Sequence, residues 1–371
     1  MTERKKILHV TQALGGVKTH IKQILKYANT NDFEHYVIST EDEELREICN
    51  ELNVKYKGIT FKRDFSIRYD ILALIAIIKY IKKVQPDVVH CHSAKGGFIG
   101  RMAARICGKK TIYTPNGLAF ISFTGIKRMV FYSLEFIAKK WTDIYLAVSY
   151  SEGNRACFEL GYDPNVVKVN LNAIPIQSVR EKDYNSVKHI GMIARLTYQK
   201  NPLLYLEVVN GLKEKYPYVT YSILGAGLHD HLVKEVKAYI HEHHLSNIIE
   251  ILPWGAASTS DSYLNTVDIF VMTSAFEGLP YSLLEAMHMG IPSVVSKADG
   301  NSDVIQNSEN GFSCLSDSEF IDRIEQLINN QDLRSKIGRA GKEYISQKHN
   351  IINNSASLEQ VYFQLIKYNT K

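Results

Sequence analysis

Short runs rich in β-branched and aromatic residues alternate with longer helical patterns along the whole chain, which is typical of parallel βαβ units. The strand-like runs are 6–10, 36–40, 87–90, 111–114 and 144–148 in the first half, and 189–193, 219–224, 249–252, 269–272 and 293–295 in the second. Helical patterns such as 70–84 and 202–215 lie between them. The two series predict an α/β protein with two doubly wound sheets, whose ligands bind at the carboxyl ends of the strands.

The domain division follows from a polar segment, 177–187, that separates the two series. We expect one Rossmann-like domain at 1–180 and a second at 181–354, facing each other across a cleft. A chain of 371 residues is long enough for two such cores. Because the tail from residue 332 has a helical pattern, we expect its end, about 355–371, to cross back onto the first domain.

Composition favours a cytoplasmic enzyme. Hydrophobic residues make up 45% of the chain and charged residues 22%, which is ordinary for a globular protein. The charged start, MTERKK, has no apolar segment behind it, and the longest apolar run, 71–78, is too short to span a bilayer. The five cysteines form no CxxC pair, so we expect reduced thiols.

The charge is divided unevenly between the halves. Residues 1–180 carry 27 lysines and arginines against 17 carboxylates, whereas residues 181–371 carry 17 against 22. A basic first half favours an anionic partner, although a solvated basic face is the alternative. Nucleic acid is disfavoured, because the basic residues are dispersed and no recognition motif accompanies them.

A basic and aromatic segment, 127–141, offers one anionic partner. It interleaves lysine and arginine with large apolar residues at helical spacing. Such a helix either rests on the anionic face of the inner membrane or packs its apolar side into the core.

The most informative segment is FEGLPYSLLEAMHMGIP, 276–292. Pro280 is expected as the first residue of a helix, so Glu277 lies in the loop beside the free N–H groups of a helix N-terminus. Such an end is a natural site for a diphosphate. Glu285 lies about 7–8 Å further along the helix, within reach of a second group of the same ligand. For an isolated pair of glutamates a surface role would be the better interpretation, but the strand, glycine, proline and helix context favours a site.

Two cations precede this segment. In IGMIARLTYQKNP, 190–202, a strand ends and presents Arg195 and then Lys200. These side chains can neutralise phosphate oxygens as a divalent metal does elsewhere. No DxD-like pair is present, and Asp299 and Asp303 are too widely spaced and are expected in a structural loop, so no metal site is predicted.

The segments 191–200, 224–227 and 276–295, in this order and spacing, resemble the retaining glycosyltransferase family 4, which has the GT-B fold. The central signature is a glutamate, seven residues and a second glutamate, which Glu277 and Glu285 match. The resemblance covers nearly the whole chain.

The first half agrees with this resemblance. Gly15 and Gly16 are similar to the family's glycine turn after the first strand, and 86–105 is similar to members that build capsules, O-antigens and exopolysaccharides. The segments 114–120 and 171–174 also fit. The family commonly has His-Gly where this chain has Asn116-Gly117, which puts the identity of the donor sugar in doubt.

The resemblance implies roles for the donor-side residues. Arg195 and Lys200 neutralise the donor diphosphate, the backbone at Gly278 and Leu279 adds N–H donors, and Glu285 accepts hydrogen bonds from the ribose. Glu277 lies beside the donor sugar and favours positive charge at its anomeric carbon. The nucleotide base is expected near 253–255.

Other roles follow for the first half. Gly15 and Gly16 allow the backbone to approach the diphosphate and the acceptor closely. Asn116 contacts the donor sugar. His92 is either a ligand of the cleft or a structural histidine, and His20 either faces the acceptor or is solvated on a helix.

The function implied is sugar transfer, without metal or other cofactor, from a nucleotide-diphosphate sugar, by default UDP-linked. The acceptor is a sugar or a lipid-diphosphate-linked oligosaccharide in bacterial surface polysaccharide assembly, and contact with the inner membrane is peripheral. The alternative is a non-catalytic nucleotide-sugar-binding or scaffold subunit of an assembly complex. The presence of Glu277, Glu285, Arg195 and Lys200 argues for an enzyme.

Overall fold

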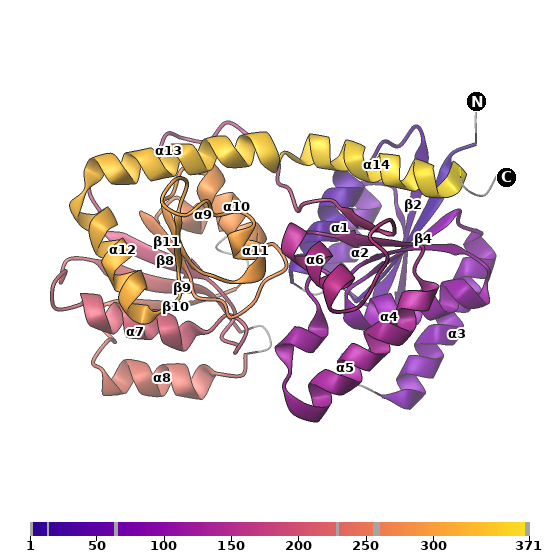
Figure 1. Ribbon diagram of the computed structural model, residues 1–371, viewed down its shortest axis with the longest axis horizontal. Helices are drawn as coiled ribbons and strands as arrows, with labels where there is room; N and C mark the ends of the chain where they lie inside the picture. Colours follow the sequence, from indigo (N-terminus) through magenta and orange to yellow (C-terminus); the bar gives the residue numbers. More distant parts are fainter. Residues whose placement is uncertain (1–2, 13–14, 63–65, 228–229, 255–259, 368–371) are drawn as a thin grey trace. The chain divides into compact units, whose positions relative to one another are not determined.

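The computed structural model describes residues 3–12, 15–62, 66–227, 230–254 and 260–367. The chain forms two compact units (Figure 1). The first unit is Met1–Asn172 together with Ile351–Lys371, and the second unit is Ala173–Asn350. No helix within the described ranges combines the length and apolarity that a membrane crossing needs.

The first unit is built on a parallel sheet in which the described residues form seven strands, in the order β3-β2-β1-β4-β5-β6-β7. The strands are β1 (Lys5–Thr11), β2 (Phe33–Thr40), β3 (Lys55–Ile59), β4 (Val88–His92), β5 (Lys110–Thr114), β6 (Ile144–Ala147) and β7 (Val167–Val169). The α-helices are α1 (Gly16–Tyr27), α2 (Glu43–Glu51), α3 (Ile67–Val84), α4 (Ala94–Ile106), α5 (Gly125–Ala138), α6 (Tyr150–Phe158) and α14 (Ile351–Lys367).

The second unit has a parallel sheet in the order β10-β9-β8-β11-β12-β13. The strands are β8 (His189–Ile193), β9 (Thr220–Ala226), β10 (Ile249–Pro253), β11 (Ile269–Met272), β12 (Ser293–Ser296) and β13 (Phe312–Cys314). The helices are α7 (Pro202–Leu212), α8 (Val233–Glu242), α9 (Ser260–Leu264), α10 (Tyr281–His288), α11 (Asp299–Ser302), α12 (Asp317–Asn329) and α13 (Gln331–Lys348).

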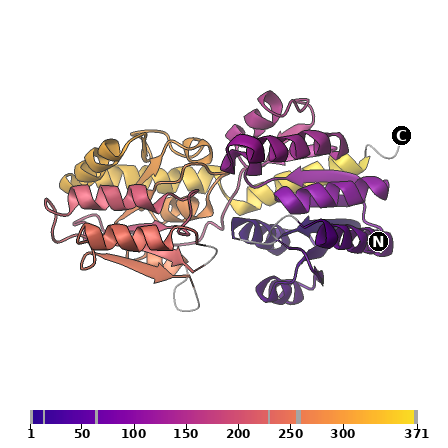
Figure 2. The same cartoon turned by 90° about the horizontal axis from the view of Figure 1, so that it is seen from below.

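Both sheets are covered by helices on their two faces, as Figures 1 and 2 show. Strands covered on both sides bury nearly every residue, which explains why β1 reads as a continuous apolar run with Ile7, Leu8 and Val10 fully buried. The chain reverses direction across each sheet between two central strands. These switch points lie between β1 and β4 in the first unit and between β8 and β11 in the second. Ligands of such sheets bind at the carboxyl ends of these strands.

The last helix, α14, belongs to the first unit. Leu358, Val361, Tyr362 and Leu365 are buried in one apolar cluster with side chains of β1, β4, β5 and β6. Each fully buried side chain of this size contributes about 1.5–3 kcal/mol, so this helix is a substantial part of the first unit's core.

The observed boundaries differ from the expected ones by several residues. The units divide at Asn172 and Ala173 rather than at 180, because the Asn172 N–H bonds the Val148 carbonyl while Ile174 pairs with Asn350. The second crossing falls after Asn350 rather than near 354.

The expected strands are all present, but three strands were not predicted. These are β3, β7 and β13, which lie at or near sheet edges; β7 and β13 have only three residues each. Edge strands are short and partly solvated, so they lack a long apolar run. The expected start of α10 is also corrected: the helix begins at Tyr281, and Pro280 is its N-cap with extended backbone.

Candidate functional site

In the second unit, the loops that follow β8 and β11 are fastened to each other at the switch point. The Thr273 hydroxyl donates to the Lys200 carbonyl over 3.1 Å and to the Asn201 carbonyl over 2.8 Å. The Ala275 N–H donates to the Gln199 carbonyl over 2.8 Å. The loop after β8 therefore has a fixed position against the loop that carries Glu277.

Lys200 and Glu277 form an ion pair across these two loops. The ammonium nitrogen lies 2.5 Å from Glu277 Oε1, and the two side chains are only 16% and 7% exposed. A charge-assisted contact of this kind is strong where water is largely excluded. The predicted cation and the predicted carboxylate are thus brought together, each serving as the partner of the other.

Arg195 lies two residues beyond β8 on the same loop as Lys200. Its side chain is half-buried, and its carbonyl accepts the Thr197 N–H over 2.9 Å, which turns the chain sharply after the strand. The neighbouring Leu196 N–H bonds the Asp230 carboxylate over 2.8 Å. This turn keeps both predicted cations within one short segment at the carboxyl end of β8.

The segment that contains Glu277, Gly278 and Leu279 leads directly into the N-terminus of α10. The N-cap residue, Pro280, makes no side-chain cap bond, and the first turn of α10 contains no acidic residue. The Glu277 carbonyl accepts the Gly300 N–H over 3.3 Å. A Cβ at Gly300 would lie 2.2 Å from the Gly278 carbonyl oxygen, so only glycine lets the start of α11 approach this loop. The helix end therefore retains the polarity that attracts an anion.

Glu285 is the fifth residue of α10, and its surroundings change the pKa of its carboxyl group strongly. Burial raises its pKa to about 7, the charge of Asp261 adds to the rise, and a hydrogen bond from Ser260 opposes it. Tyr281, one turn earlier, has its pKa raised by burial and by the Glu285 charge. A ligand that donates hydrogen bonds to the carboxylate stabilises its charged form, so binding there is coupled to proton release near neutral pH.

Two expectations for the second unit need correction or stay open. Asp299 and Asp303 were expected in a structural loop, but Asp299 begins the short helix α11 and Asp303 follows its last residue. The position expected for a nucleotide base, 253–255, includes Gly255, which lies outside the described residues.

In the first unit, Gly15 is the N-cap of α1 and Gly16 is its first residue. Gly15 has a φ of 52° with ψ −130°, a conformation that side chains disfavour, and nothing lies within 4 Å of the place a Cβ would occupy. Its carbonyl accepts the Lys18 N–H over 3.0 Å and so starts the helix. The glycine turn is present at the carboxyl end of β1, beside the first unit's switch point.

Asn116 follows β5 in left-handed backbone, with a φ of 55°. Its amide nitrogen contacts the Thr114 carbonyl at 3.4 Å, and its buried Oδ1 has no hydrogen-bond partner among the residues that the structure describes. The next residue, Gly117, donates its N–H to the Glu152 carboxylate over 2.7 Å. Glu152 also accepts the Val148 N–H over 3.0 Å and is 4% exposed, so it holds the Asn116 loop in place.

Glu152 was missed from the sequence, although a signal was present. Ser149 and Glu152 form the S-x-x-E pattern of a helix N-terminus, and the Ser149 hydroxyl accepts the Glu152 N–H over 3.1 Å. Only the tertiary structure brings the carboxylate onto the loop after β5.

His92 ends β4 and belongs to a cluster of buried histidines that the sequence did not reveal. The described members are His9, His20, His35, His90 and His92. His20 is 6% exposed and bonds Asn172 over 3.1 Å, so the solvated alternative for this residue is wrong.

Three of these histidines have the spacing of metal ligands. One nitrogen from each of His9, His90 and His92 lies within 4.8 Å of the others. Both nitrogens of His9 bond other histidines, and both nitrogens of His90 bond Tyr362 and Thr114 over 2.8 and 2.9 Å. An ion would have to displace existing hydrogen bonds, so the group is arranged as a hydrogen-bonded cluster.

Comparison with known proteins identifies the family of this chain. Residues 14–178 match the model of Glycosyltransferase Family 4, and residues 175–344 match the model of Glycosyl transferases group 1. The chain belongs to glycosyltransferase family 4. The resemblance inferred from the ordered motifs is therefore confirmed.

This family 4 glycosyltransferase has relatives in surface polysaccharide assembly. It is 27% identical to the Escherichia coli UDP-Gal:α-D-GlcNAc-diphosphoundecaprenol α-1,3-galactosyltransferase over 97% of both chains. It is 24% identical to the capsular polysaccharide biosynthesis glycosyltransferase CapM of Staphylococcus aureus over 98% of both chains.

Solved structures confirm the fold of this glycosyltransferase. HepE of Anabaena, solved in complex with UDP-glucose, superimposes with a TM-score of 0.82 at 18% identity, covering 97% of this chain and 99% of that one. TarM superimposes with a TM-score of 0.78 at 15% identity, over 98% and 99% of the two chains. The two-sheet α/β architecture is the GT-B fold that the sequence led us to expect.

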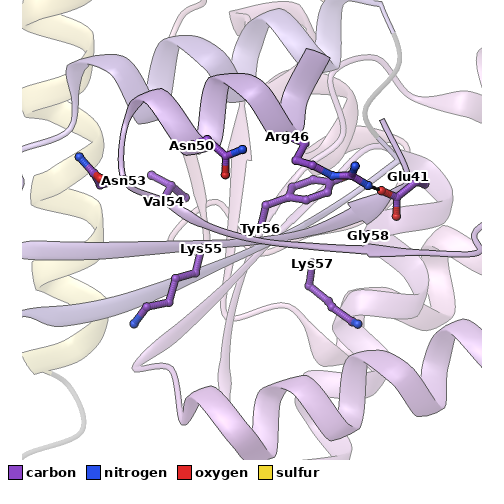
Figure 3. A pocket seen from close by; sticks show the side chains of 9 residues that line it. All are labelled: Glu41, Arg46, Asn50, Asn53, Val54, Lys55, Tyr56, Lys57 and Gly58. Atoms are coloured by element: carbon purple, nitrogen blue, oxygen red, sulfur yellow. Dashed lines mark ion pairs between the residues drawn. The ribbon is translucent and has the colours of Figure 1, made fainter. Parts of the chain in front are cut away.

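A separate surface pocket of the glycosyltransferase lies between α2 and β3 (Figure 3). Arg46 pairs with Glu41 there and lies over the Tyr56 ring, and Lys55 and Lys57 extend from β3. Since β3 is the edge strand, this pocket is remote from the switch point of its sheet, and it contains no predicted site residue.

Proposed function

We propose that this glycosyltransferase transfers a sugar from a UDP-linked donor to a lipid-diphosphate-linked acceptor, with retention of anomeric configuration and without a metal. The observation that carries the proposal is the Lys200–Glu277 pair beside the N-terminus of α10. It combines a cation, a helix end suited to phosphate and a carboxylate at one place in the second unit.

The proposed chemistry assigns each of these groups a task. Arg195, Lys200 and the N–H groups of α10 stabilise the diphosphate as the bond from its oxygen to the anomeric carbon breaks. Glu277, drawn from Lys200 when the phosphate arrives, stabilises positive charge on the sugar. The departing phosphate oxygen takes the proton of the acceptor hydroxyl, whose oxygen bonds the anomeric carbon from the same face. Glu285 accepts hydrogen bonds from the ribose.

The relatives support the choice of substrates. The Escherichia coli relative is named for a UDP-galactose donor and an acceptor linked to diphosphoundecaprenol, and HepE was crystallised with UDP-glucose. Asn116 replaces the family's usual histidine, and we propose that it contacts the donor sugar through the amide.

The test is transfer in solution. Purified protein is incubated with each of several radiolabelled UDP-sugars and with a synthetic α-GlcNAc-diphosphate-lipid, in buffer with EDTA. We expect one UDP-sugar to label the lipid with the α configuration retained, as proton NMR of the product reports. Binding of UDP-sugars without any transfer or hydrolysis would instead support the scaffold alternative, and inversion or a requirement for added Mg²⁺ would contradict the mechanism.

We further propose that the first unit docks peripherally on an anionic membrane through α3 and α5. In α5, Ile126 and Met129 are 80% and 69% exposed, and Phe136 is 45% exposed. In α3, Ile67 and Ile71 are 67% and 52% exposed. Both helices pack against α4 on the same face of the sheet, so their outer sides face the same way (Figure 1).

Charge accompanies this apolar surface. Lys127 and Lys140 are exposed on and just beyond α5, and Lys79, Lys82 and Lys83 are exposed on α3. A core-facing α5 was the alternative, and it does not account for Ile126, Met129 and Phe136, which are exposed to solvent. An exposed apolar surface edged with lysine fits an interface of acyl chains and anionic headgroups.

Liposome co-sedimentation tests the docking surface. We expect binding to vesicles that contain phosphatidylglycerol, weaker binding in high salt, and weak binding to pure phosphatidylcholine. Lys127→Glu and Lys140→Glu should each weaken binding at least about fivefold, since a lysine near the surface is worth about 1 kcal/mol.

Ile352→Asp is the matched control, because Ile352 is 59% exposed on α14, which packs on the opposite face of the same sheet. Equal binding by the lysine variants and the control, or no preference for anionic vesicles, would contradict the docking surface.

A further inference from the structure

Three of the buried histidines form a continuous chain across the central strands of the first unit. His35 on β2 bonds His9 on β1 through Nδ1 and Nε2 over 2.9 Å, and His9 bonds His92 on β4 through Nδ1 and Nε2 over 3.0 Å. The rings are stacked, with centroids 5.2 and 5.3 Å apart. His9 and His92 are completely buried, and His35 is 7% exposed.

The three imidazoles are neutral, and their protons are coupled. Burial lowers the pKa of His35 to about 4, and burial with neighbouring imidazoles lowers the pKa of His9 and His92 well below the usual value. A neutral imidazole has one N–H donor and one bare nitrogen. If His92 donates from Nε2, then His9 must donate to His35; if His92 accepts at Nε2, then His35 must donate to His9.

Each end of the chain carries an unsatisfied nitrogen. His92 Nδ1 and His35 Nε2 are buried and have no hydrogen-bond partner in the described part of the chain. One of the two is a donor and the other an acceptor, whichever way the chain is oriented. The tautomer that His92 presents at Nδ1 is therefore determined by the imidazole two rings away.

The His92 end lies where a ligand of this sheet is expected. His92 is the last residue of β4, at the switch point, and its strand partner is Thr114 on β5. Among the described residues, the adjoining Ser93 Oγ and Asn116 Oδ1 are also buried without hydrogen-bond partners. A buried polar atom left unsatisfied costs about 1–3 kcal/mol, so three such atoms at the carboxyl ends of β4 and β5 fit a ligand that is rich in hydroxyl groups.

We propose that His9 and His35 are positioning residues that fix the tautomer through which His92 hydrogen-bonds a substrate hydroxyl. The identity of the hydroxyl as that of a sugar rests on the proposed function. His35 does not touch the substrate; it acts through His9, as the partner of a ligating or catalytic histidine sets which ring nitrogen carries the proton.

The direct test is long-range proton–nitrogen NMR of the wild-type protein labelled with ¹⁵N-histidine, at pH 7. We expect a single neutral tautomer for each of His9, His35 and His92. Addition of UDP-glucose or of the α-GlcNAc-diphosphate-lipid should shift the nitrogens of all three rings. Mixed tautomers in the free protein, or a response confined to His92, would overturn the proposal without any variant being needed.

Kinetics of variants provide a second test. His35→Phe keeps an aromatic ring, slightly larger than imidazole, but removes the hydrogen bond, and we expect kcat to fall about tenfold with the donor KM unchanged. His35→Asn, which can occupy the place of Nδ1, should restore kcat to within about threefold of wild type.

The control is Tyr362→Phe, which removes a comparable buried hydrogen bond, 2.8 Å long. Its partner is His90, which is not one of the three coupled histidines. Equal kcat in His35→Phe and Tyr362→Phe would overturn the positioning role while leaving the transferase assignment intact. If the wild type transfers no sugar, the proposed function fails. The tautomers seen in the spectra still show whether His9, His35 and His92 are coupled through their hydrogen bonds.

Discussion

Glu277→Gln is expected to lower kcat for sugar transfer by about 10²–10³-fold, the usual effect of removing one preorganised group that stabilises transition-state charge. The amide keeps the shape and can accept a hydrogen bond from Lys200 but has no negative charge for the sugar. Lys200, which now lies 2.5 Å from Glu277 Oε1, loses its counter-ion and becomes available to phosphate.

A consequence separates this role from a structural one. Because Lys200 is released, the affinity of the variant for UDP should be unchanged or tighter, as calorimetry measures, while transfer is lost. Glu214→Gln is the control, since this exposed carboxylate of the second unit lies outside the site. Retained transfer in Glu277→Gln, or equal losses of kcat and UDP affinity, would contradict the assignment.

Glu135→Ala is expected to lower the free energy of unfolding by about 3–5 kcal/mol, because it leaves a buried guanidinium without its counter-ion. Arg101 is completely buried and Glu135 is 4% exposed, with 2.8 Å between Arg101 NH2 and Glu135 Oε2. The other carboxylate oxygen accepts the Tyr113 hydroxyl over 2.7 Å. The pair joins α4 to α5, so its loss also loosens the helix proposed to meet the membrane.

Urea unfolding followed by circular dichroism measures this change. Glu159→Ala is the matched control: Glu159 also pairs with arginine, but its side chain is 31% exposed, and a surface pair contributes about 0–1 kcal/mol. Replacing both partners, as in Arg101→Met with Glu135→Leu, should recover most of the loss. Equal effects of Glu135→Ala and Glu159→Ala would show that the buried pair has no special weight.

The candidate site shows where inference from sequence was strong. Local patterns predicted the positions of the strands along the chain, the loop position of Glu277 and the cations after β8. This was possible because a strand end and a helix start are marked by residues close in sequence. The family assignment followed from the same ordered motifs. Pro280 was predicted one residue too far into α10, because proline is common at the first helical position, whereas here it is the N-cap.

Sequence reasoning failed where a group depends on partners distant in the chain. Glu152 donates its N–H to the N-cap Ser149 and accepts the Gly117 N–H at its carboxylate, and the sequence identified neither bond. His92 was recognised as a candidate, but its coupling to His9 and His35 was not. Apolar residues of α5 were compatible with both core and surface, and only the packing of the helix on α4 distinguished these possibilities.

The sequence by itself determined the two parallel sheets, the helix that begins after Glu277 and the family, since periodicity and capping are local properties. Tertiary structure alone decided the pairing of Lys200 with Glu277, 77 residues apart, and of His9 with His92, 83 residues apart. The physical reason is strand register. Parallel strands bring distant residues to neighbouring positions on one face, and no local pattern encodes which residues meet there.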